Sequence, residues 1–214
     1  MRINVDSSAP VFVGIGELLW DCFDTDRWPG GAPANTAFHA HQLGCESYIF
    51  SRVGRDRWGD ALIQYIGSKG LATDYIQRDP EHPTGEVTVD TSRPAAPTYH
   101  IHENVAWDYL DFGPDERDLM ARTEAVCFGT LAQRNSVSRR AVHAAIESVK
   151  PSTLVVYDVN LRQSYFHKYW IERSLVLSSI VKLNIEEVEK KRHLCPLGVP
   201  PGGGFGGVLI QKYG

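Results

Sequence analysis

The sequence predicts an α/β fold in which parallel strands are joined by helices, with an antiparallel pair of strands outside the main sheet. Strand-like and helix-like runs alternate over residues 11–70 and again from residue 124 onward, a rhythm typical of parallel sheets with helical crossovers. Between these parts, residues 84–110 alternate polar and apolar side chains at period two, and Pro94 and Pro97 separate the two runs. This pattern favours a hairpin-like pair of strands.

The elements of the main sheet are expected in regular order along the chain. Strands are expected at residues 11–16, 47–54, 124–130, 152–160 and 179–184. Helices are expected at residues 32–43, 58–70, 136–149 and 167–178, with a charged helix beginning at residue 185.

The first two helices have clear boundaries in the sequence. Pro33 suits the first turn of the first helix, and Gly44 can cap its end. Phe38 and Leu43 share an apolar side between these two points. In the second helix, Gly70 closes a run of apolar residues at helical spacing. That run consists of Trp58, Leu62, Tyr65 and Ile66.

Composition and charge limit the class of protein. Hydrophobic residues make up 43% and charged residues 22% of the 214 residues, as in ordinary soluble globular domains. The formal net charge of -4 gives no reason to expect nucleic acid or an acidic membrane as a partner. The four cysteines form no CxxC pair, which argues against a structural zinc site and a secreted disulfide framework. Because no signal-peptide pattern is visible, a cytoplasmic location is expected.

Residues 30–35 combine glycines, a helix start and an amide side chain. Gly30 and Gly31 would let the backbone approach a ligand closely, because no Cβ stands in the way. Asn35 lies about one turn inside the helix, where its amide could both donate to and accept from a polyol. An ordinary loop-to-helix junction is the alternative interpretation, since short glycine motifs are weak evidence.

Charged side chains follow two strands at the edge where ligands bind in a doubly wound sheet. Asp21 comes five residues after Gly16 and could accept two hydroxyl hydrogens from a sugar. The alternative for Asp21 is a solvated loop residue. Asp158, Asn160 and Arg162 lie at the end of a later strand. Arg162 could bind an anionic group there through two parallel hydrogen bonds.

Asn184 and Glu187 lie at the end of the last expected strand and three residues beyond it. At this spacing both side chains point the same way over a first helical turn. Their oxygens would suit a hydrated Mg²⁺ ion, which usually keeps most of its waters. The alternative is a helix N-cap at Asn184, with Glu187 favourable to the helix dipole.

Two further patterns carry less weight. The run GGGFGG at residues 202–207 contains the spacing GxGxxG, but no expected strand precedes it, so a dinucleotide-binding role lacks its structural context. His100 and His102 would share one face of a strand. No third metal ligand is evident near them, which favours exposed histidines.

Taken together, several segments resemble the ribokinase, or PfkB, family of carbohydrate kinases, particularly its fructokinase-like branch. The stretch GGAPANTAFHAHQLG…SRVGRDRWGD is similar to the family's N-terminal signature. The other segments occur in the family's order: GIGELLWDCF, TGEVTVD, YHIHENVAWDYL, FGTLAQR, DVNLR and KLNIEE. The resemblance extends from about residue 11 to about residue 189.

The resemblance implies a Rossmann-like, doubly wound α/β fold with a small β-sheet lid over a sugar site. We expect residues 1–214 to form a single domain of this type, with lid segments at about residues 18–30 and 84–110. By the same resemblance, the sugar-binding residues are Asp21, Gly30, Gly31, Asn35, Arg134 and Arg162. Asn184 and Glu187 match the family's NxxE element, which helps to position Mg²⁺ and phosphate. ATP and Mg²⁺ are therefore the implied cofactors.

The sequence departs from the family in one respect. The family's C-terminal DTxGAGD-like motif offers backbone N–H groups to the developing phosphate charge, and its Asp takes a proton from the sugar hydroxyl. No GAGD occurs in the 214 residues. We therefore expect the C-terminal part of the fold to be missing, with no catalytic base, no direct metal ligand and an irregular tail at residues 194–214.

Three functional hypotheses follow. The resemblance implies ATP-dependent phosphorylation of a sugar hydroxyl, of the fructokinase or ribokinase type, with this chain catalytically incomplete. The alternatives are a non-catalytic sugar-binding remnant and an unstable truncated product with an exposed sheet edge. The implied partner is a small-molecule sugar, for which fructose fits best; ribose, ketodeoxygluconate and nucleosides stay open as substrates, because the lid side chains decide among them. A second copy of the chain, paired through the lid, is a further expectation.

Overall fold

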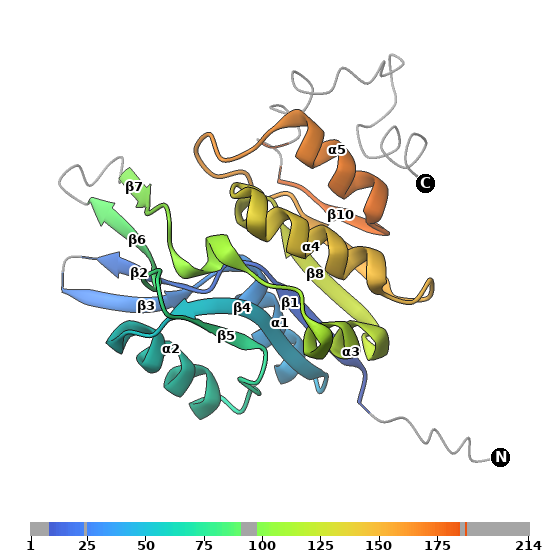
Figure 1. Cartoon of the computed structure of the whole chain (residues 1–214), viewed down its shortest axis with the longest axis horizontal. Coiled ribbons are helices and arrows are strands. Elements are labelled where there is room, and N and C mark those ends of the chain that lie inside the picture. Colours follow the sequence, from blue (N-terminus) through green and yellow to red (C-terminus); the bar gives the residue numbers. More distant parts are fainter. Residues whose placement is uncertain (1–8, 24, 91–97, 185–186, 188–214) are drawn as a thin grey trace.

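A parallel sheet forms the centre of the molecule. The computed structural model describes residues 9–23, 25–90, 98–184 and 187. Within these residues, the main sheet has the strand order β10-β9-β8-β1-β4-β5, and every neighbouring pair is parallel (Figure 1). The strands are β1 (Val11–Ile15), β4 (Glu46–Gly54), β5 (Ile76–Asp79), β8 (Ala125–Gly129), β9 (Leu154–Asp158) and β10 (Ile180–Lys182).

Helices cover both faces of the main sheet. Helices α1 (Ala32–Gln42) and α2 (Arg57–Ser68) pack on one face, where Ala37 and Leu62 join the buried apolar cluster. Three further helices contribute to the cluster on the other face. They are α3 (Pro114–Arg122), α4 (Ser136–Ser148) and α5 (Lys168–Leu177). Because both faces are covered, the central strands are apolar on both sides, and the predicted doubly wound α/β class is confirmed.

Asp56 fixes the start of α2 against the next part of the chain. Its carboxylate accepts the N-capping hydrogen bonds from the N–H groups of Trp58 and Gly59, at 2.9 and 2.8 Å. It also accepts from the N–H and the hydroxyl of Thr84, both at 2.8 Å. One carboxylate therefore joins the helix start to the entrance of the next sheet, which explains why the sequence places Asp directly before the helix.

A small sheet lies beside the carboxyl ends of the main strands, on the left in Figure 1, toward which the arrowhead of β4 points. Its strand order is β3-β2-β6-β7. The strands are β2 (Leu19–Phe23), β3 (Asp26–Gly30), β6 (Gly85–Asp90) and β7 (Thr98–Ile101). The β6–β7 pair is antiparallel, as predicted for residues 84–110, whereas β2 and β6 pair in parallel.

The structure differs from the predicted elements in three places. Residues Ala106–Tyr109 form the 3₁₀ helix η1 instead of continuing a strand. Strand β5 and helix α3 were not predicted from the sequence. The charged helix expected from residue 185 lies outside the described residues except at Glu187, which is helical. The predicted irregular tail at residues 194–214 also lies outside them. None of the helices in the described ranges has the length and hydropathy needed to cross a membrane.

Candidate functional site

A cleft opens where the main sheet changes winding direction. Strand β1 lies between β4 and β8. The strands β4 and β5 extend the sheet on one side of β1, and the later strands β8, β9 and β10 extend it on the other side. Such switch points place a crevice at the carboxyl ends of the strands. Here the small sheet forms the opposite wall, and the enclosed volume is about 840 Å³. The lining residues are Glu17, Leu19, Asp21, Phe23, Gly31, Ala32, Asn35, Val87, Tyr99, Ile101, Leu131, Asn160, Leu161, Arg162 and Gln163.

Strand alternation determines which side chains of the small sheet face the cleft. In β2, Leu19, Asp21 and Phe23 line the cleft, as expected for residues two apart in a strand. Trp20, on the opposite face, packs edge-on against Trp58 and donates its indole N–H to the Trp58 carbonyl at 3.0 Å. Asp21 is therefore a strand residue, and the interpretation of it as a loop residue after β1 was wrong. The strand gives Asp21 a fixed orientation toward the cleft.

Two opposite charges approach each other in the cleft. Partial burial raises the pKa of Asp21, and the nearby Arg162 guanidinium acts in the opposite direction. Arg162 is largely exposed and extends from the loop after β9. Asp21 and Arg162 therefore come from opposite walls, the small sheet and the main sheet. A ligand between them would meet an acceptor on one side and a donor on the other.

Gly30 and Gly31 make room for protein atoms. A Cβ on Gly30 would lie 2.3 Å from Asp21 Oδ2, and a Cβ on Gly31 would lie 2.2 Å from the carbonyl oxygen of Glu17. Gly31 also has a φ of 117° at the N-cap of α1, a region that favours glycine. Gly31 lines the cleft, whereas Gly30 lines a neighbouring pocket of about 300 Å³ between α1 and α2. The side of each glycine on which a Cβ would lie is thus occupied by Asp21 or Glu17, while the binding of a sugar by Gly30 and Gly31 stays a prediction.

Asn35 lies in the first turn of α1, at the cleft, as the sequence indicated. It is the fourth residue of α1, its backbone N–H donates to the Gly31 carbonyl at 2.9 Å, and its exposed side chain lines the cleft. The amide can donate and accept at once. Asn35 therefore lies within reach of the same ligand volume as Asp21 and Arg162, although the sequence separates the three residues widely.

Glu17 is a lining residue that sequence reasoning missed. It lies two residues after the end of β1 and is only 3% exposed. Its Oε1 accepts a hydrogen bond from the N–H of Ala32, the first residue of α1, at 3.2 Å. Burial raises its pKa to about 7, while backbone hydrogen bonds and Arg162 act in the opposite direction. A polar residue shortly after a buried strand was the available signal, but it gave no indication that the carboxylate would be buried.

The loop after β9 is attached to the small sheet by side-chain hydrogen bonds that have no sequence signature. Gln163 donates its side-chain N–H to the carbonyl of Tyr99 in β7 at 2.5 Å. Tyr165 donates its hydroxyl to Glu103, just beyond β7, at 2.7 Å. These bonds hold the loop that carries Arg162 against the small sheet, and so they close one end of the cleft.

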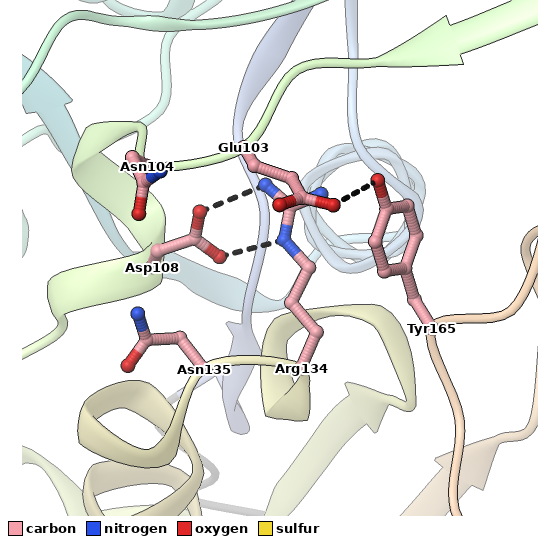
Figure 2. Close-up of a pocket in the computed structure, with 6 residues that line it drawn as sticks. All are labelled: Glu103, Asn104, Asp108, Arg134, Asn135 and Tyr165. Atoms are coloured by element: carbon pink, nitrogen blue, oxygen red, sulfur yellow. Dashed lines mark hydrogen bonds and ion pairs between the residues drawn. The ribbon is translucent and has the colours of Figure 1, made fainter.

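Arg134 was predicted to bind sugar, but it lies in a different pocket, of about 260 Å³ (Figure 2). Its guanidinium forms two parallel bonds to the Asp108 carboxylate, from Nε at 2.7 Å and from Nη2 at 2.8 Å. Nη2 also donates to the His102 carbonyl at 2.5 Å. The pocket is lined by Glu103, Asn104, Asp108, Arg134, Asn135 and Tyr165. The structure therefore separates Arg134 from Asp21, Asn35 and Arg162.

Asn184 and Glu187 make reciprocal capping contacts. Asn184 Oδ1 accepts from the Glu187 N–H at 2.8 Å, and Glu187 Oε2 accepts from the Asn184 N–H at 2.9 Å. Glu187 Oε1 accepts from the N–H of Leu161, also at 2.9 Å. The capping alternative is thus present in the structure. Because Leu161 precedes Arg162, Glu187 also fixes the base of the loop that carries this arginine.

The described residues do not by themselves form a magnesium site. Both Glu187 oxygens accept backbone hydrogen bonds. The nearby Asp158 carboxylate is paired with Lys182, whose Nζ lies 2.9 and 3.0 Å from its two oxygens. In the ranges that the structure describes, no three or more His, Cys, Asp or Glu side chains are grouped so as to hold a metal ion.

The fold and the cleft together define a doubly wound α/β protein with a ligand-sized cleft beside a small sheet, and comparison with known proteins identifies the family. The family model described as pfkB family carbohydrate kinase matches residues 8–195. The chain therefore belongs to the pfkB family of carbohydrate kinases, as its resemblance indicated.

Curated relatives are longer than this chain. A putative sugar kinase of Pyrococcus horikoshii is 31% identical over 195 residues, which cover 83% of this chain and 63% of the relative. A fructokinase of Klebsiella pneumoniae is 27% identical, covering 82% of this chain and 56% of the relative. An ATP-dependent 6-phosphofructokinase of Thermoanaerobacterium thermosaccharolyticum is 27% identical, covering 86% and 60%. The chain thus spans about three fifths of the length of these relatives.

Solved structures support the same fold. A crystal structure of the Pyrococcus horikoshii sugar kinase matches with a TM-score of 0.80 at 30% identity, covering 90% of this chain and 68% of that one. The same kinase in complex with ATP matches with a TM-score of 0.79. A fructokinase of Vibrio cholerae in its apo form has a TM-score of 0.73 at 24% identity, covering 88% and 67%; this last likeness supports the fold alone.

Proposed function

We propose that the cleft binds a neutral monosaccharide. The chain would then supply the sugar-binding part of a kinase of the fructokinase or ribokinase type, which transfers a phosphoryl group from ATP to a sugar hydroxyl. One observation carries the proposal: Asp21, Asn35 and Arg162 come from three separate parts of the chain and line one cleft. Relatives named sugar kinase and fructokinase support this class of substrate.

Each polar residue of the cleft would have a distinct part in holding the sugar. The Asp21 carboxylate would accept hydrogens from sugar hydroxyls, and such charge-assisted bonds are the stronger kind. The Asn35 amide would donate and accept, and Arg162 would donate from the opposite wall. Val87 and Ile101 supply apolar walls from the small sheet, which exclude water around the bound ring.

The charges of the cleft favour a neutral sugar over a sugar phosphate or a sugar acid. Among the described residues that line it, two carry carboxylates, Glu17 and Asp21, and one carries a guanidinium, Arg162. An anionic group would meet Arg162 only in competition with the Asp21 carboxylate. This arrangement favours the fructokinase-like substrate over the fructose phosphate named for one relative.

We further propose that these 214 residues bind sugar without transferring phosphate. Phosphoryl transfer depends mainly on positioning and on stabilising charge at the phosphate. The motif to which the resemblance assigns the anion hole and the base, GAGD, does not occur in the sequence. ATP would supply the phosphoryl group in a complete kinase. The contribution of Asn184 and Glu187 to phosphate handling remains a proposal, and their capping contacts would serve it by ordering the backbone.

The small sheet is the proposed lid and the proposed surface for pairing with a second copy. Its outer strands in the described structure are β3 and β7. Trp28 on β3 is 62% exposed, whereas the carbonyl of Tyr99 on β7 already accepts a hydrogen bond from Gln163. Exposed strand edges are ready templates for pairing with another chain. Dimerisation through this sheet stays a prediction.

Replacing Asp21 with asparagine is expected to weaken the binding of D-fructose about 10- to 100-fold, because hydrogen bonds to a charged group contribute about 1.5–3 kcal/mol. Asn keeps the shape of the side chain but loses the charge and one acceptor. Isothermal titration calorimetry of both proteins with D-fructose measures the effect directly.

Asp26→Asn provides the matched control, since Asp26 is exposed on β3 of the same small sheet and lies outside the cleft. Its affinity for D-fructose should equal that of the unchanged protein. If Asp21→Asn and Asp26→Asn have equal affinities, the cleft is not the sugar site. If neither variant nor the unchanged protein binds D-fructose, glucose or ribose, the sugar-binding proposal itself fails.

The purified 214-residue chain is expected to release no ADP from ATP and Mg²⁺ in a sugar-dependent manner, because the GAGD motif, to which the resemblance assigns the proton acceptor and the anion hole, does not occur in the sequence. A coupled assay for ADP, run with D-fructose and D-ribose, tests this expectation. Sugar-dependent turnover would show that other residues of the chain supply these groups.

A further inference from the structure

Glu17 is a buried carboxylate at the wall of the cleft, and one of its oxygens has no partner. The residue is 3% exposed and lines the cleft. Oε1 accepts from the Ala32 N–H. Within the part of the chain that the structure describes, Oε2 is buried without a hydrogen-bond partner. An ionised carboxylate in this place would leave one oxygen without either water or a donor, which is costly.

The groups around Glu17 leave its charge only partly compensated. Arg162, in the loop after β9, favours the ionised form, whereas Asp158, at the end of β9, opposes it. Asp158 is itself held by Lys182. Cys127 of β8 also interacts with Glu17, but burial raises the pKa of the Cys127 thiol to about 11, so the thiol stays neutral near pH 7. The backbone N–H groups of Glu17 itself and of Ala32, at the start of α1, also favour the ionised form.

We propose that Glu17 couples the binding of a neutral polyol in this cleft to the uptake of a proton. The inference rests on the proposed sugar site and makes Glu17 a positioning residue of that site. The proton comes from solvent and is bound by the Glu17 carboxylate, so that no other bond forms or breaks. The neutral carboxyl still accepts the Ala32 hydrogen bond, and the start of α1 keeps its place beside the sugar.

The direction of the coupling follows from burial. Burial is the largest cause of the raised pKa of Glu17, about 7 in the free protein. A sugar that fills the cleft displaces the water nearest to the carboxylate and so raises this pKa further. Binding then favours the protonated form. Sugar affinity is therefore highest below pH 7 and falls as pH rises through the interval between the free and the bound pKa.

The expected size of the pH effect follows if the pKa of Glu17 in the sugar complex lies one unit above its pKa in the free protein. Affinity for D-fructose would then be about fivefold lower at pH 8 than at pH 6, with uptake of about half a proton per sugar near pH 7.5. Calorimetry in phosphate and in Tris, whose protonation enthalpies differ, measures this uptake in the unchanged protein. This measurement uses only the unchanged protein, so it does not depend on whether a variant folds.

Glu17→Gln is the decisive variant. Gln keeps the shape and an oxygen acceptor for the Ala32 N–H but cannot titrate, so the affinity of E17Q for D-fructose should be the same at pH 6 and pH 8. His102→Gln is the matched control, because it replaces an ionisable side chain directly after β7 that does not line the cleft; H102Q should retain the full pH dependence.

The outcomes separate this inference from the proposed function. Binding of D-fructose without proton uptake, or with proton release, overturns the role of Glu17 and leaves the sugar site intact. A pH dependence that disappears in H102Q but persists in E17Q also overturns it. Absence of binding to any of the sugars at any pH overturns both proposals together.

Discussion

Replacing Arg134 with methionine is expected to lower the free energy of unfolding by about 3–5 kcal/mol, because the Asp108 carboxylate would remain buried without its charged partner. The two side chains are 6% and 2% exposed. The guanidinium also lies over the Trp107 ring at 4.0 Å from its centroid and over the Tyr165 ring at 4.8 Å. Urea denaturation followed by circular dichroism measures the loss.

Arg122→Met is the matched control for this prediction. Arg122 forms an ion pair with Glu46 at 2.8 Å, but the two side chains are 43% and 45% exposed. Exposed pairs contribute about 0–1 kcal/mol because water and salt screen them. Equal losses in the two variants would contradict the claim that burial makes the Arg134 pair important. The double variant Arg134→Met/Asp108→Leu should recover much of the loss, since no unpaired charge remains.

The main sheet could be predicted from the sequence because both of its faces are covered by helices. Strands such as β1 and β8 then appear as continuous apolar runs, and their crossover helices carry apolar residues at helical spacing. The signal was weaker for β5, which has only four residues. Helix α3 has a polar surface and few apolar residues, of which Leu119 and Met120 are buried. Its Pro114 start was a signal that periodicity alone did not use.

The small sheet could be predicted only in part from the local pattern. The antiparallel pair β6–β7 has a period of two and was found. Strand β2 follows β1 after only a few residues, and its parallel pairing with β6 joins segments more than sixty residues apart. No local pattern encodes such a pairing. For this reason the local pattern left a solvated loop residue open as the alternative for Asp21, whereas the resemblance placed it in a lid segment beside the sugar.

The cleft residues were predicted unevenly, for a physical reason. Asn35 and Arg162 follow recognisable boundaries, a helix start and a strand end, and the structure brings both to the cleft. Arg134 also follows a strand, but its side chain turns to Asp108, a partner that sequence cannot indicate. Glu17 was missed because the direction and burial of a side chain after a strand depend on tertiary packing. Positions could be predicted, whereas the partners of charged side chains could not.

Gly31→Ala is expected to destabilise the protein by about 3 kcal/mol or more, because backbone strain and a steric clash act together. The φ of Gly31 is 117°, where a residue with a Cβ is strained. Its Cβ would lie 2.2 Å from the Glu17 carbonyl oxygen and 3.3 Å from the Leu18 Cα. Both are backbone atoms of the segment between β1 and β2, so relief requires that this segment or the start of α1 move. Thermal and urea unfolding measure the loss of stability.

Gly67→Ala separates this effect from the general consequences of adding a methyl group. Gly67 lies within α2, and a Cβ there would have no atom within 4 Å. Alanine is the better helix former, so this variant should gain up to about 1 kcal/mol. Any displacement of α1 in Gly31→Ala also moves Asn35 and the Ala32 N–H that contacts Glu17. The folded fraction of Gly31→Ala should therefore bind D-fructose more weakly, whereas Gly67→Ala should bind it unchanged. If Gly31→Ala is as stable as Gly67→Ala, the close packing of this glycine against Glu17 does not hold the wall of the cleft.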